Sequence, residues 1–349
     1  MQEEISDKAK ALWDIVQSSR SKNRYWVRVM KHNDIRYPWS LHECALMVRD
    51  GLRELGYVAY FDDEKVGTDY GWPTPEERAE REDCEQQIII GGNIASAKAL
   101  ATIPDSAIVY NFEQVGGHQF APPYLGLLRR CTVWEYHPAN IQRLKYYFNI
   151  TATFVPFGYV DAFAPKPHKP VAPDYDVMFY GSMNPPRMKV VAALRTAGLR
   201  VLAAEGCYGA DREDKMHRSK MILNVHYYQR VKIMEVVRLG IAMAAGKTVV
   251  TQLDKDTIVD PYYLPGIAGA PYDELVPTIV KLAKDDRARE RIALKGLELF
   301  TARRAADSLQ KGLDLYVPRQ PASPPKSYER PRNDASVTYR RIPRTGQIW

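Results

Sequence analysis

A proline-rich stretch divides this chain of 349 residues into two runs of alternating strands and helices. Residues 165–173 hold four prolines in nine positions, which excludes a helix interior or a central strand and favours a stiff, extended linker. On both sides of it, β-branched and aromatic runs alternate with segments of helical apolar spacing. Because repeated β-α-β units build parallel sheets, the sequence predicts two α/β domains that face each other.

The domain boundaries follow from this stretch and from the charge distribution. We expect a first domain at residues 1–164, a linker at 165–173, a second domain with closing helices at 174–317, and a tail at 318–349. The formal net charge is +7, and seven basic and two acidic residues in the tail account for +5 of it. The tail is rich in proline and arginine with little apolar periodicity, which predicts a disordered or surface-draped segment. Since the body is nearly neutral, affinity for an anionic polymer would depend on the tail.

The composition is that of a globular protein. Hydrophobic residues make up 45% and charged residues 26% of the chain, and no apolar run approaches the roughly 20 residues that span a bilayer. The acidic start lacks the apolar region of a secretory signal. The four cysteines are far apart and form no C-x-x-C pair, which favours free thiols over a disulfide framework or a zinc site. We therefore expect a cytoplasmic protein.

Apolar periodicity places the individual elements. In the first half we expect strands at 25–30, 58–61, 87–90, 107–112, 131–134 and 153–155, and helices at 122–130 and 138–148. In the second half we expect strands at 176–180, 200–203, 221–225 and 248–250, and helices that include 211–219, 232–245 and 283–315. Ser40 and Glu43 form a capping-box pattern at the start of a further helix, which Gly56 would end.

Residues 181–187, between an expected strand and an expected helix, are the first candidate for a binding site. Backbone amides at a helix start favour phosphate, and Arg187 would add a charged fork suited to a diphosphate. Gly181, Ser182 and Asn184 lie in the same turn. The alternative is that Gly181 only permits the turn and that Arg187 is a solvated helix residue.

His226, Tyr227 and Tyr228 follow the expected strand at 221–225. Open α/β sheets bind ligands at the carboxyl edge of their strands. Aromatic rings at that edge can stack on a base or a sugar, and a histidine can donate to a hydroxyl or a phosphate. Alternatively, the three side chains close the strand and pack under a loop.

Lys232, Glu235 and Arg238 are spaced by three, which places them on one face of the expected helix. Two cations could neutralise the charge that grows on a departing diphosphate, and the carboxylate could bind hydroxyls. The alternative is an ion-pair ladder on a solvated face. Apolar residues flank all three, which favours a helix buried on most sides, where unused charges are costly.

The first domain offers weaker candidates. Glu113 follows an expected strand and precedes a Gly-Gly-His turn, so it could bind an acceptor or act as a general base. The alternative is a loop carboxylate in water. Gly91-Gly92-Asn93 is a similar turn with a weaker signal, and His32 and His42 are more simply interpreted as structural.

Taken together, these segments resemble bacterial and phage glycosyltransferases of the GT-B architecture, which has two facing Rossmann-like domains. Residues 175–187, 218–228 and 232–238 carry the resemblance through F-Y-G-S with N-x-x-R, L-N-x-H-Y-Y and K-x-x-E-x-x-R; residues 110–114 and 134–141 agree more loosely. The resemblance covers about residues 25–300 and leaves the tail outside. It implies a donor site lined by Gly181, Asn184, Arg187, His226, Lys232, Glu235 and Arg238.

The sequence departs from the GT-B pattern in one place. Many retaining enzymes of this architecture carry a Glu-x7-Glu pair before an A-x-G-x-P-V-V segment. Residues 244–250 match that segment, but Ile233 and Ile241 occupy the glutamate positions. Glu235, two residues along, could serve instead, which leaves the stereochemical outcome open.

The resemblance implies transfer of a hexosyl or related sugar from a nucleoside-diphosphate sugar to a hydroxyl acceptor. Glu235, Arg238, Lys232 and Glu113 would be the catalytic residues, with Ser182 and Tyr227 also at the donor. We expect no cofactor besides the nucleotide-sugar co-substrate, and no metal, since the proposed site has no D-x-D-type cluster. The acceptor would be a glycan, a small molecule, or hydroxylated bases of phage DNA, whose phosphates the basic tail would bind. Alternatives are a nucleotide-sugar epimerase of the same fold and a non-catalytic nucleotide-sugar or nucleic-acid binding protein.

Overall fold

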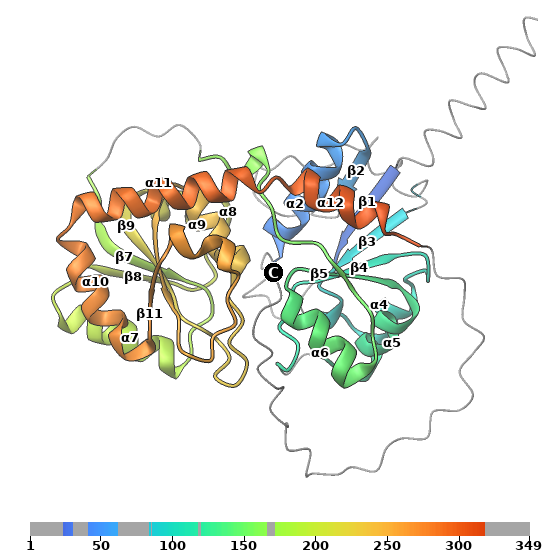
Figure 1. Ribbon diagram of the computed structural model, residues 1–349, viewed down its shortest axis with the longest axis horizontal. Helices are drawn as coiled ribbons and strands as arrows, with labels where there is room; N and C mark the ends of the chain where they lie inside the picture. The colour runs from blue at the N-terminus through green and yellow to red at the C-terminus, as the bar shows by residue number, and fades with distance from the viewer. Residues whose placement is uncertain are drawn as a thin grey trace, which may run out of the picture.

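The computed structural model describes residues 24–30, 41–61, 84, 86–117, 120–165 and 172–317. In this part of the chain, two parallel sheets with helices between their strands form the two halves of the molecule (Figure 1). The first sheet has the order β2-β1-β3-β4-β5-β6, and its strands are β1 (Arg24–Val29), β2 (Val58–Phe61), β3 (Gln86–Ile90), β4 (Ile108–Asn111), β5 (Thr132–Glu135) and β6 (Thr153–Phe154). The second has the order β11-β10-β9-β7-β8, with strands β7 (Tyr175–Tyr180), β8 (Val201–Ala204), β9 (Ser219–Asn224), β10 (Thr248–Gln252) and β11 (Ala268–Ala270). The predicted α/β class is confirmed.

Helices cover both faces of the first sheet. The elements on this half are α2 (His42–Glu54), η1 (Gly92–Ile94), α4 (Ala97–Ala101), α5 (Pro122–Arg130), α6 (Pro138–Phe148) and η2 (Asp161–Phe163). The apolar sides of α4, α5 and α6 pack on one face, against Ile89, Val109 and Val133. The other face, which includes Val27 and Ile88, packs against α2. Because alternate residues of a strand point to opposite faces, each strand contributes side chains to both helix-covered layers.

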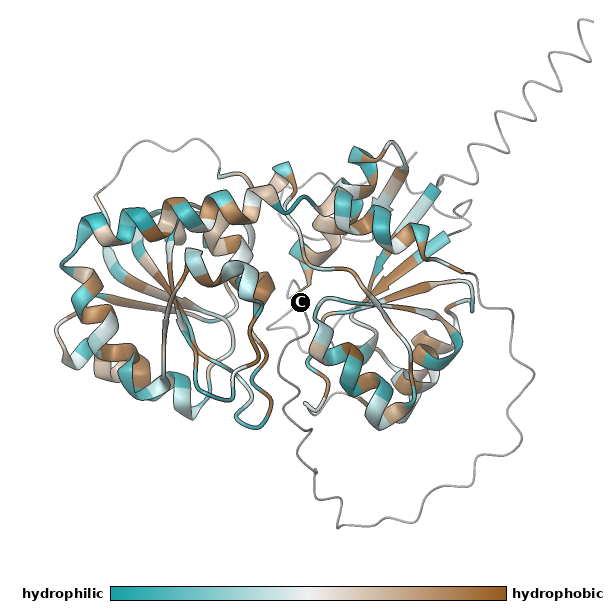
Figure 2. Cartoon of the chain, viewed as in Figure 1, coloured by the Kyte–Doolittle hydropathy of each residue, from teal (hydrophilic) through white to brown (hydrophobic). Residues whose placement is uncertain are grey.

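The second sheet is covered in the same way. Its elements are α7 (Pro185–Thr196), α8 (Gly209–His217), α9 (Val236–Ala244), η3 (Pro261–Gly266), η4 (Tyr272–Glu274), α10 (Leu275–Ala283) and α11 (Asp286–Ala302); the last helix, α12 (Ala305–Asp314), follows them in the chain. Helices α7 and α10 lie on one face, whereas α8, α9 and α11 lie on the other. Figure 2 shows the resulting pattern, with hydrophobic strands inside and hydrophilic outer helix surfaces. Two helices on one side and three on the other bury the strands almost completely.

The final helix departs from the predicted domain division. Residues 305–314 are expected to close the second domain, but α12 packs on α2 of the first. Gly51 in α2 allows this approach, since a Cβ there would lie 2.6 Å from Leu309 Cδ1. The expected helix at 283–315 is interrupted at Arg303, whose carbonyl accepts a bond from the Tyr159 amide at 2.7 Å. This hydrogen bond with the first half marks the end of α11, after which the chain returns to the first domain as α12.

The predicted helix at 232–245 is wrong at its start, because α9 begins only at Val236. Residues before it are extended: the Ile258 amide donates to the Lys232 carbonyl at 2.7 Å, and the Met234 amide donates to the Ile258 carbonyl at 3.0 Å. Lys232 is therefore not on the helix face that carries Arg238. A partner 25 residues along the chain overrides the local helical spacing.

Several predictions fall outside the described residues. They are the opening helix, the capping residue Ser40, His32, most of the proline linker and the tail at 318–349. Among the described helices, none is both long and apolar enough to cross a bilayer.

Candidate functional site

Four polar side chains meet where the second sheet reverses its strand order. Strand β8 lies on one side of β7 and β9 on the other, so the carboxyl ends of β7 and β9 flank a topological switch point. Ligands of open α/β sheets bind at such points. Asn224 ends β9, His226 follows it, and Glu235 and Arg238 lie at the amino end of α9. We refer to these four residues as the donor-side cluster, after the donor site that the sequence predicts here.

Hydrogen bonds fix the geometry of the donor-side cluster. Glu235 Oε2 lies 3.0 Å from His226 Nδ1 and accepts a bond from Asn224 Nδ2 at 3.0 Å. Arg238 Nη1 donates to Asn224 Oδ1 at 2.9 Å. Asn224 is thus a bridge that orients a carboxylate and a guanidinium beside each other, and it was not among the predicted site residues.

The electrostatics of the cluster keep Glu235 ionised. Burial by itself would raise the pKa of Glu235, but the electrostatic interaction and hydrogen bond with His226, together with the Arg238 charge and the Asn224 hydrogen bond, lower it to about 2. On its other side, His226 Nε2 lies 3.1 Å from Thr257 Oγ1. His226 is 1% exposed, and its ring is held between Glu235 and Thr257.

Gly181 brings the end of β7 against Arg238. Its φ is +116°, a conformation that favours glycine, and a Cβ built there would lie 2.7 Å from Arg238 Nη2. The structure gives Arg238 one side-chain hydrogen bond within the described residues, the bond from Nη1 to Asn224. The Nη2 and Nε groups of Arg238 lie near the amino end of α9, where the helix dipole favours binding of an anion.

The turn after β7 is built by Asn184 and Arg187. Asn184 caps α7 by accepting from the Arg187 amide at 3.2 Å, and its Nδ2 donates to the Tyr227 carbonyl at 2.9 Å. Arg187 is 2% exposed, and its guanidinium donates to the carbonyls of Val225 and Ser182 at 2.7–2.9 Å. Burial lowers the pKa of Arg187 to about 9, and the nearby positive charge of Arg238 contributes to the same shift. Arg187 is therefore not a solvated helix residue; it holds the ends of β7 and β9 together.

Tyr227 is an exposed aromatic ring at this edge. Its side chain is 44% exposed, while the Arg187 guanidinium lies 5.1 Å from its ring centroid. Tyr228 packs edge-on against it at 5.1 Å between centroids. Because Arg187 and Tyr228 support the Tyr227 ring while much of it is exposed, the ring is suited to stacking on a base or a sugar.

Lys232 forms ion pairs with two carboxylates that do not belong to the donor-side cluster. Its Nζ lies 2.8 Å from Asp254 Oδ2 and 3.0 Å from Asp256 Oδ1. Burial opposes the charge, but the two carboxylates raise the pKa of Lys232 overall. Lys232 thereby fixes the loop after β10, the same loop that carries Thr257.

A second polar network lies at the carboxyl ends of β4 and β5 in the first domain. Glu135 is fully buried, and its carboxylate accepts bonds from Asn111 Nδ2 at 2.6 Å and Asn140 Nδ2 at 2.9 Å. Burial raises the pKa of Glu135 to about 8, although N–H donors around it act in the opposite direction. Asn140 also donates to the Glu113 carbonyl at 3.0 Å. We call Glu135, Asn111 and Asn140 the acceptor-side hub, after the acceptor role that the sequence predicts for Glu113.

Glu113 lies between this hub and the second domain. Its Oε1 accepts from the Gln114 amide at 2.9 Å, and its carboxylate is hydrogen-bonded by Tyr228 of the second domain. Burial raises the pKa of Glu113. The sequence predicted that Glu113 follows a strand, and the structure agrees. Its hydrogen-bond partner Tyr228, in the other domain, could not be predicted from the sequence.

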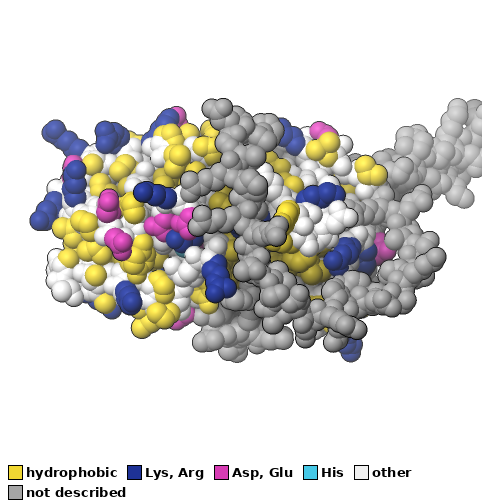
Figure 3. Space-filling model, turned by 60° about the horizontal axis from the view of Figure 1, so that its bottom comes forward, with side chains coloured by type: hydrophobic (Ala, Val, Ile, Leu, Met, Phe, Trp, Pro, Cys, Tyr) yellow, Lys and Arg dark blue, Asp and Glu magenta, His cyan; other side chains and the backbone are white. Residues whose placement is uncertain are grey.

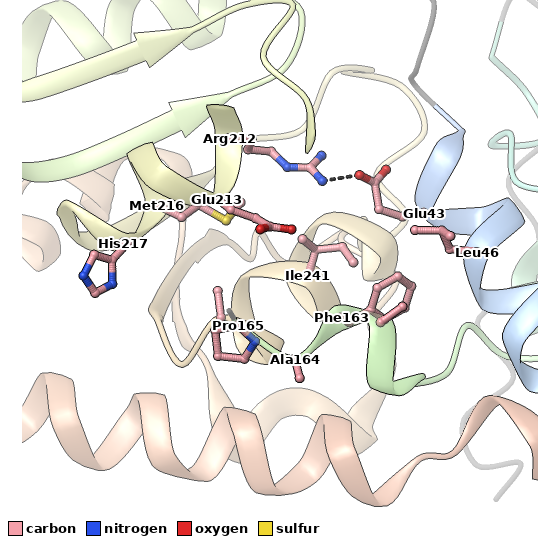
Figure 4. Close-up of a pocket in the computed structure, with 12 residues that line it drawn as sticks. Glu43, Leu46, Phe163, Ala164, Pro165, Arg212, Glu213, Met216, His217 and Ile241 are labelled. Atoms are coloured by element: carbon pink, nitrogen blue, oxygen red, sulfur yellow. Dashed lines mark hydrogen bonds and ion pairs between the residues drawn. The ribbon is translucent and has the colours of Figure 1, made fainter. Parts of the chain in front are cut away.

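A further contact joins the domains behind the site. Figure 4 shows Glu43 of α2 directed at Arg212 of α8, with which it forms a buried ion pair. The Glu43 carboxylate binds Arg212, and α2 has no side-chain cap at Leu41, whereas Ser40, the expected capping partner of Glu43, lies outside the described residues. Beside the pair is a cavity of about 50 Å³, lined also by Phe163 and by Ile241 and Ala245. Since these last two lie toward the carboxyl end of α9, the cavity and the donor-side cluster are at opposite ends of that helix.

The residues that sequence reasoning missed share one property. Asn224, Glu135, Asn140 and Thr257 act on other side chains rather than on an exposed surface. Asn224 and Glu135 are polar residues at the end of apolar strands, and Asn140 lies in the first turn of a helix, whereas Thr257, in the loop after β10, has no such sequence signal. Within the described residues, no group of three His, Cys, Asp or Glu is placed to hold a metal ion.

No family model matches the sequence. Curated relatives occur in Acanthamoeba polyphaga mimivirus and are uncharacterized. One is 29% identical over 139 residues, which is 39% of this chain and 16% of the relative; another is 24% identical over 179 residues, which is 50% of this chain and 58% of the relative. The chain thus matches less than two thirds of the length of these relatives.

Solved structures share the fold. An α-glucosyltransferase in complex with UDP and a 13-mer DNA containing a central A:G mismatch has a TM-score of 0.57 at 12% identity, covering 84% of this chain and 99% of that one. A glycosyltransferase from Rickettsia africae ESF-5 has a TM-score of 0.51 at 10% identity, covering 84% and 98%. Sucrose-phosphate synthase from Thermosynechococcus elongatus has a TM-score of 0.52 at 11% identity, covering 83% and 98%. The chain has the two-domain GT-B architecture of these glycosyltransferases.

Proposed function

We propose that this protein is a glycosyltransferase that moves a sugar from a nucleoside-diphosphate sugar to a hydroxyl acceptor. The observation that carries the proposal is the donor-side cluster, in which an ionised carboxylate and a guanidinium are fixed side by side at a switch point of the second sheet. The GT-B fold supports it as an analogy, since the solved structures with this fold include several glycosyltransferases.

The proposed chemistry uses the two charges differently. Arg238, at the amino end of α9 and against Gly181, would bind the diphosphate and stabilise the negative charge that grows on it as the sugar leaves. Glu235 would accept hydrogen bonds from sugar hydroxyls as an anion. No metal or other cofactor is invoked for these roles, and whether the sugar is a hexose stays a prediction.

The other predicted donor residues divide into contacts and supports. Gly181 and Ser182 would offer close backbone approach, and Tyr227 would stack on the base or the sugar. Arg187, Asn184 and Lys232 are assigned positioning roles, because their polar atoms already bind carbonyls or carboxylates of the protein. Their direct contact with the donor stays a prediction.

The acceptor would meet Glu113 across the domain interface. A raised pKa brings a carboxyl closer to the working pH of a general base, which suits removal of a proton from a hydroxyl. The attacking oxygen would take the sugar, the hydroxyl proton would pass to Glu113, and the nucleoside diphosphate would leave with the bonding electron pair.

The first test is a thermal-shift panel of nucleoside diphosphates and their sugar conjugates with wild type, Arg238→Ala and Arg195→Ala. Arg195 lies near the end of α7 and donates to a backbone carbonyl, so it is a matched arginine outside the cluster. We expect one nucleotide family to stabilise wild type and Arg195→Ala but not Arg238→Ala. Stabilisation that survives Arg238→Ala would contradict the proposed site.

Transfer itself is then measured by release of nucleoside diphosphate with and without hydroxyl acceptors. Release that depends on the acceptor, with a glycosylated product, supports the proposal. An isomerised free nucleotide sugar would identify an epimerase, and tight binding without any product would identify a binding protein.

A DNA acceptor is a finer version of the same proposal. The solved α-glucosyltransferase with DNA shares this fold, and the tail at 318–349 carries a formal charge of +5. On the face seen in Figure 3, the described Lys and Arg side chains are scattered rather than gathered into a stripe. We therefore expect deletion of 318–349 to weaken DNA binding and to flatten its salt dependence. An unchanged salt slope would remove the tail from the argument.

A further inference from the structure

The backbone of Ile233 is paired with the first domain by a single side chain. Gln114 Nε2 donates to the Ile233 carbonyl at 3.2 Å, and the Ile233 amide donates to Gln114 Oε1 at 3.3 Å. Both residues are buried, Gln114 with 7% and Ile233 with none of its surface exposed. A primary amide offers one donor and one acceptor side by side, so it can replace a peptide group of a neighbouring strand.

The extended segment before α9 explains why Ile233 needs such a partner. Its neighbours Lys232 and Met234 use their carbonyl and amide to pair with Ile258. In an extended chain, the backbone polar groups of successive residues point in opposite directions. The amide and carbonyl of Ile233 therefore face away from Ile258, toward the first domain, and would be buried without a partner if Gln114 were absent.

The loop that carries Gln114 is held firmly from its own side. The Val115 amide donates to Asn140 Oδ1 at 2.9 Å, and Arg143 donates to the Val115 carbonyl at 3.1 Å. Asn140 belongs to the acceptor-side hub, so the hub and the loop form one unit. At the tip, a Cβ on Gly117 would lie 2.9 Å from the ring of Tyr228, which shows how closely the loop approaches the second domain.

We propose that Gln114 is a positioning residue that sets the register of the two domains. Its amide pair with Ile233 fixes Glu113, the preceding residue, relative to Glu235, which lies two residues beyond Ile233. The inference rests on the proposed function in that Glu113 and Glu235 are taken as the acceptor-side and donor-side carboxylates. Two parallel hydrogen bonds restrict both sliding and rotation, which a single bond or an apolar contact would not do.

Gln114→Met tests this assignment, because methionine keeps the length of the side chain and removes both hydrogen bonds. The matched control is Gln86→Met: Gln86 donates to the Ser106 carbonyl at 2.9 Å, within the first domain. The first readout is amide hydrogen exchange of the peptide spanning residues 229–236. We expect exchange at Ile233 to rise at least tenfold in Gln114→Met and to stay unchanged in Gln86→Met. Unchanged exchange in Gln114→Met would overturn the pairing.

The second readout is kinetic. We expect kcat of transfer to fall at least tenfold in Gln114→Met, while the thermal shift produced by the nucleoside diphosphate stays within the range of wild type. Gln114→Glu keeps the acceptor for the Ile233 amide and loses the donor, so we expect an intermediate loss. A wild-type kcat in Gln114→Met would overturn the positioning role even where exchange has risen.

The two arms separate this inference from the proposed function. If wild type transfers no sugar from any donor, the proposed function fails, while the exchange arm still decides whether Gln114 pairs the domains. If wild type transfers sugar and Gln114→Met does so equally well, the proposed function stands and the positioning role fails.

Discussion

Each domain holds a glutamate beside an asparagine at a strand end, fully buried in the first domain and partly exposed in the second, and the pKa values of the two carboxyls shift in opposite directions. Glu235 accepts from Asn224, pairs with His226 and lies near Arg238, and its pKa falls to about 2. Glu135 accepts from two asparagines but has no cation among the groups that shift its pKa, and burial raises that pKa to about 8. Nearby cations, and not the number of hydrogen bonds, therefore decide which carboxyl is ionised.

Under the proposed function, the contrast corresponds to a division of roles between the domains. The donor-side cluster is preorganised as a pair of opposite charges, which is useful where charge develops during a reaction. The acceptor-side hub is a scaffold that fixes the loop of Glu113 and Gln114 through Asn140. Replacing the same functional group in each domain should therefore affect different properties, transfer in one case and stability in the other.

Glu235→Gln should have the largest effect, on transfer. The amide keeps an oxygen that can accept from Asn224 but removes the charge, so we expect kcat to fall about 10²–10³-fold, on the order of 3–4 kcal/mol of transition-state stabilisation. Stability should fall as well, because the lowered pKa of Glu235 means that the carboxylate stabilises the fold above pH 4.5 and loses this effect as the pH falls toward 2. Steady-state transfer kinetics beside circular dichroism separate the two effects, and wild-type turnover would contradict the assigned role.

Glu135→Gln should instead change how stability depends on pH. Because the raised pKa favours the protonated carboxyl in the folded state, wild type should lose stability as the pH rises from about 5 to 8, by on the order of a few kcal/mol. The variant should be less stable than wild type at pH 5, since its NH2 group faces N–H donors, but its stability should vary less between pH 5 and 8. Urea unfolding at several pH values measures this. Parallel curves for the two proteins would show that Glu135 is ionised throughout.

Gly181→Ala tests how the donor-side cluster depends on a missing side chain. Its Cβ would meet Arg238 Nη2 at 2.7 Å, and its φ of +116° would be strained, so we expect a cost of about 1–3 kcal/mol and weaker binding of nucleoside diphosphate. Gly198→Ala is the matched control, because Gly198 also has a positive φ, +84°, but no atom within 4 Å of the added Cβ. Equal loss of nucleotide binding in both variants would attribute the effect to backbone strain and not to Arg238.

Asn184→Ala should have the smallest effect. It removes the cap of α7 and the hydrogen bond to the Tyr227 carbonyl, and loss of a cap costs about 1 kcal/mol. Because Tyr227 loses a support, we also expect weaker stacking on the nucleotide sugar, seen as a smaller thermal shift. A stability loss without any change in that shift would show that Tyr227 keeps its place unaided.

The strands of both sheets could be predicted because each is a short apolar run bounded by turn residues, and ten of the expected strands correspond to strands in the structure within a few residues. Strand β11, with the sequence Ala-Gly-Ala, was not predicted since it has no such signal. The candidate residues at strand ends could be named for a related reason: in a parallel sheet, strand order alone brings those ends to one edge.

Two properties could be predicted from the amino-acid order alone: the two parallel α/β halves, and the placement of Gly181, His226, Glu235 and Arg238 near one sheet edge. Both follow from local periodicity and strand direction. Three other properties depend on long-range packing: α9 begins at Val236, α12 returns to the first domain, and the pKa values of Glu235 and Glu135 shift in opposite directions. Each of these depends on a partner distant in the sequence: Ile258 for the extended segment, α2 for the last helix, and the presence or absence of a facing cation for the carboxyls.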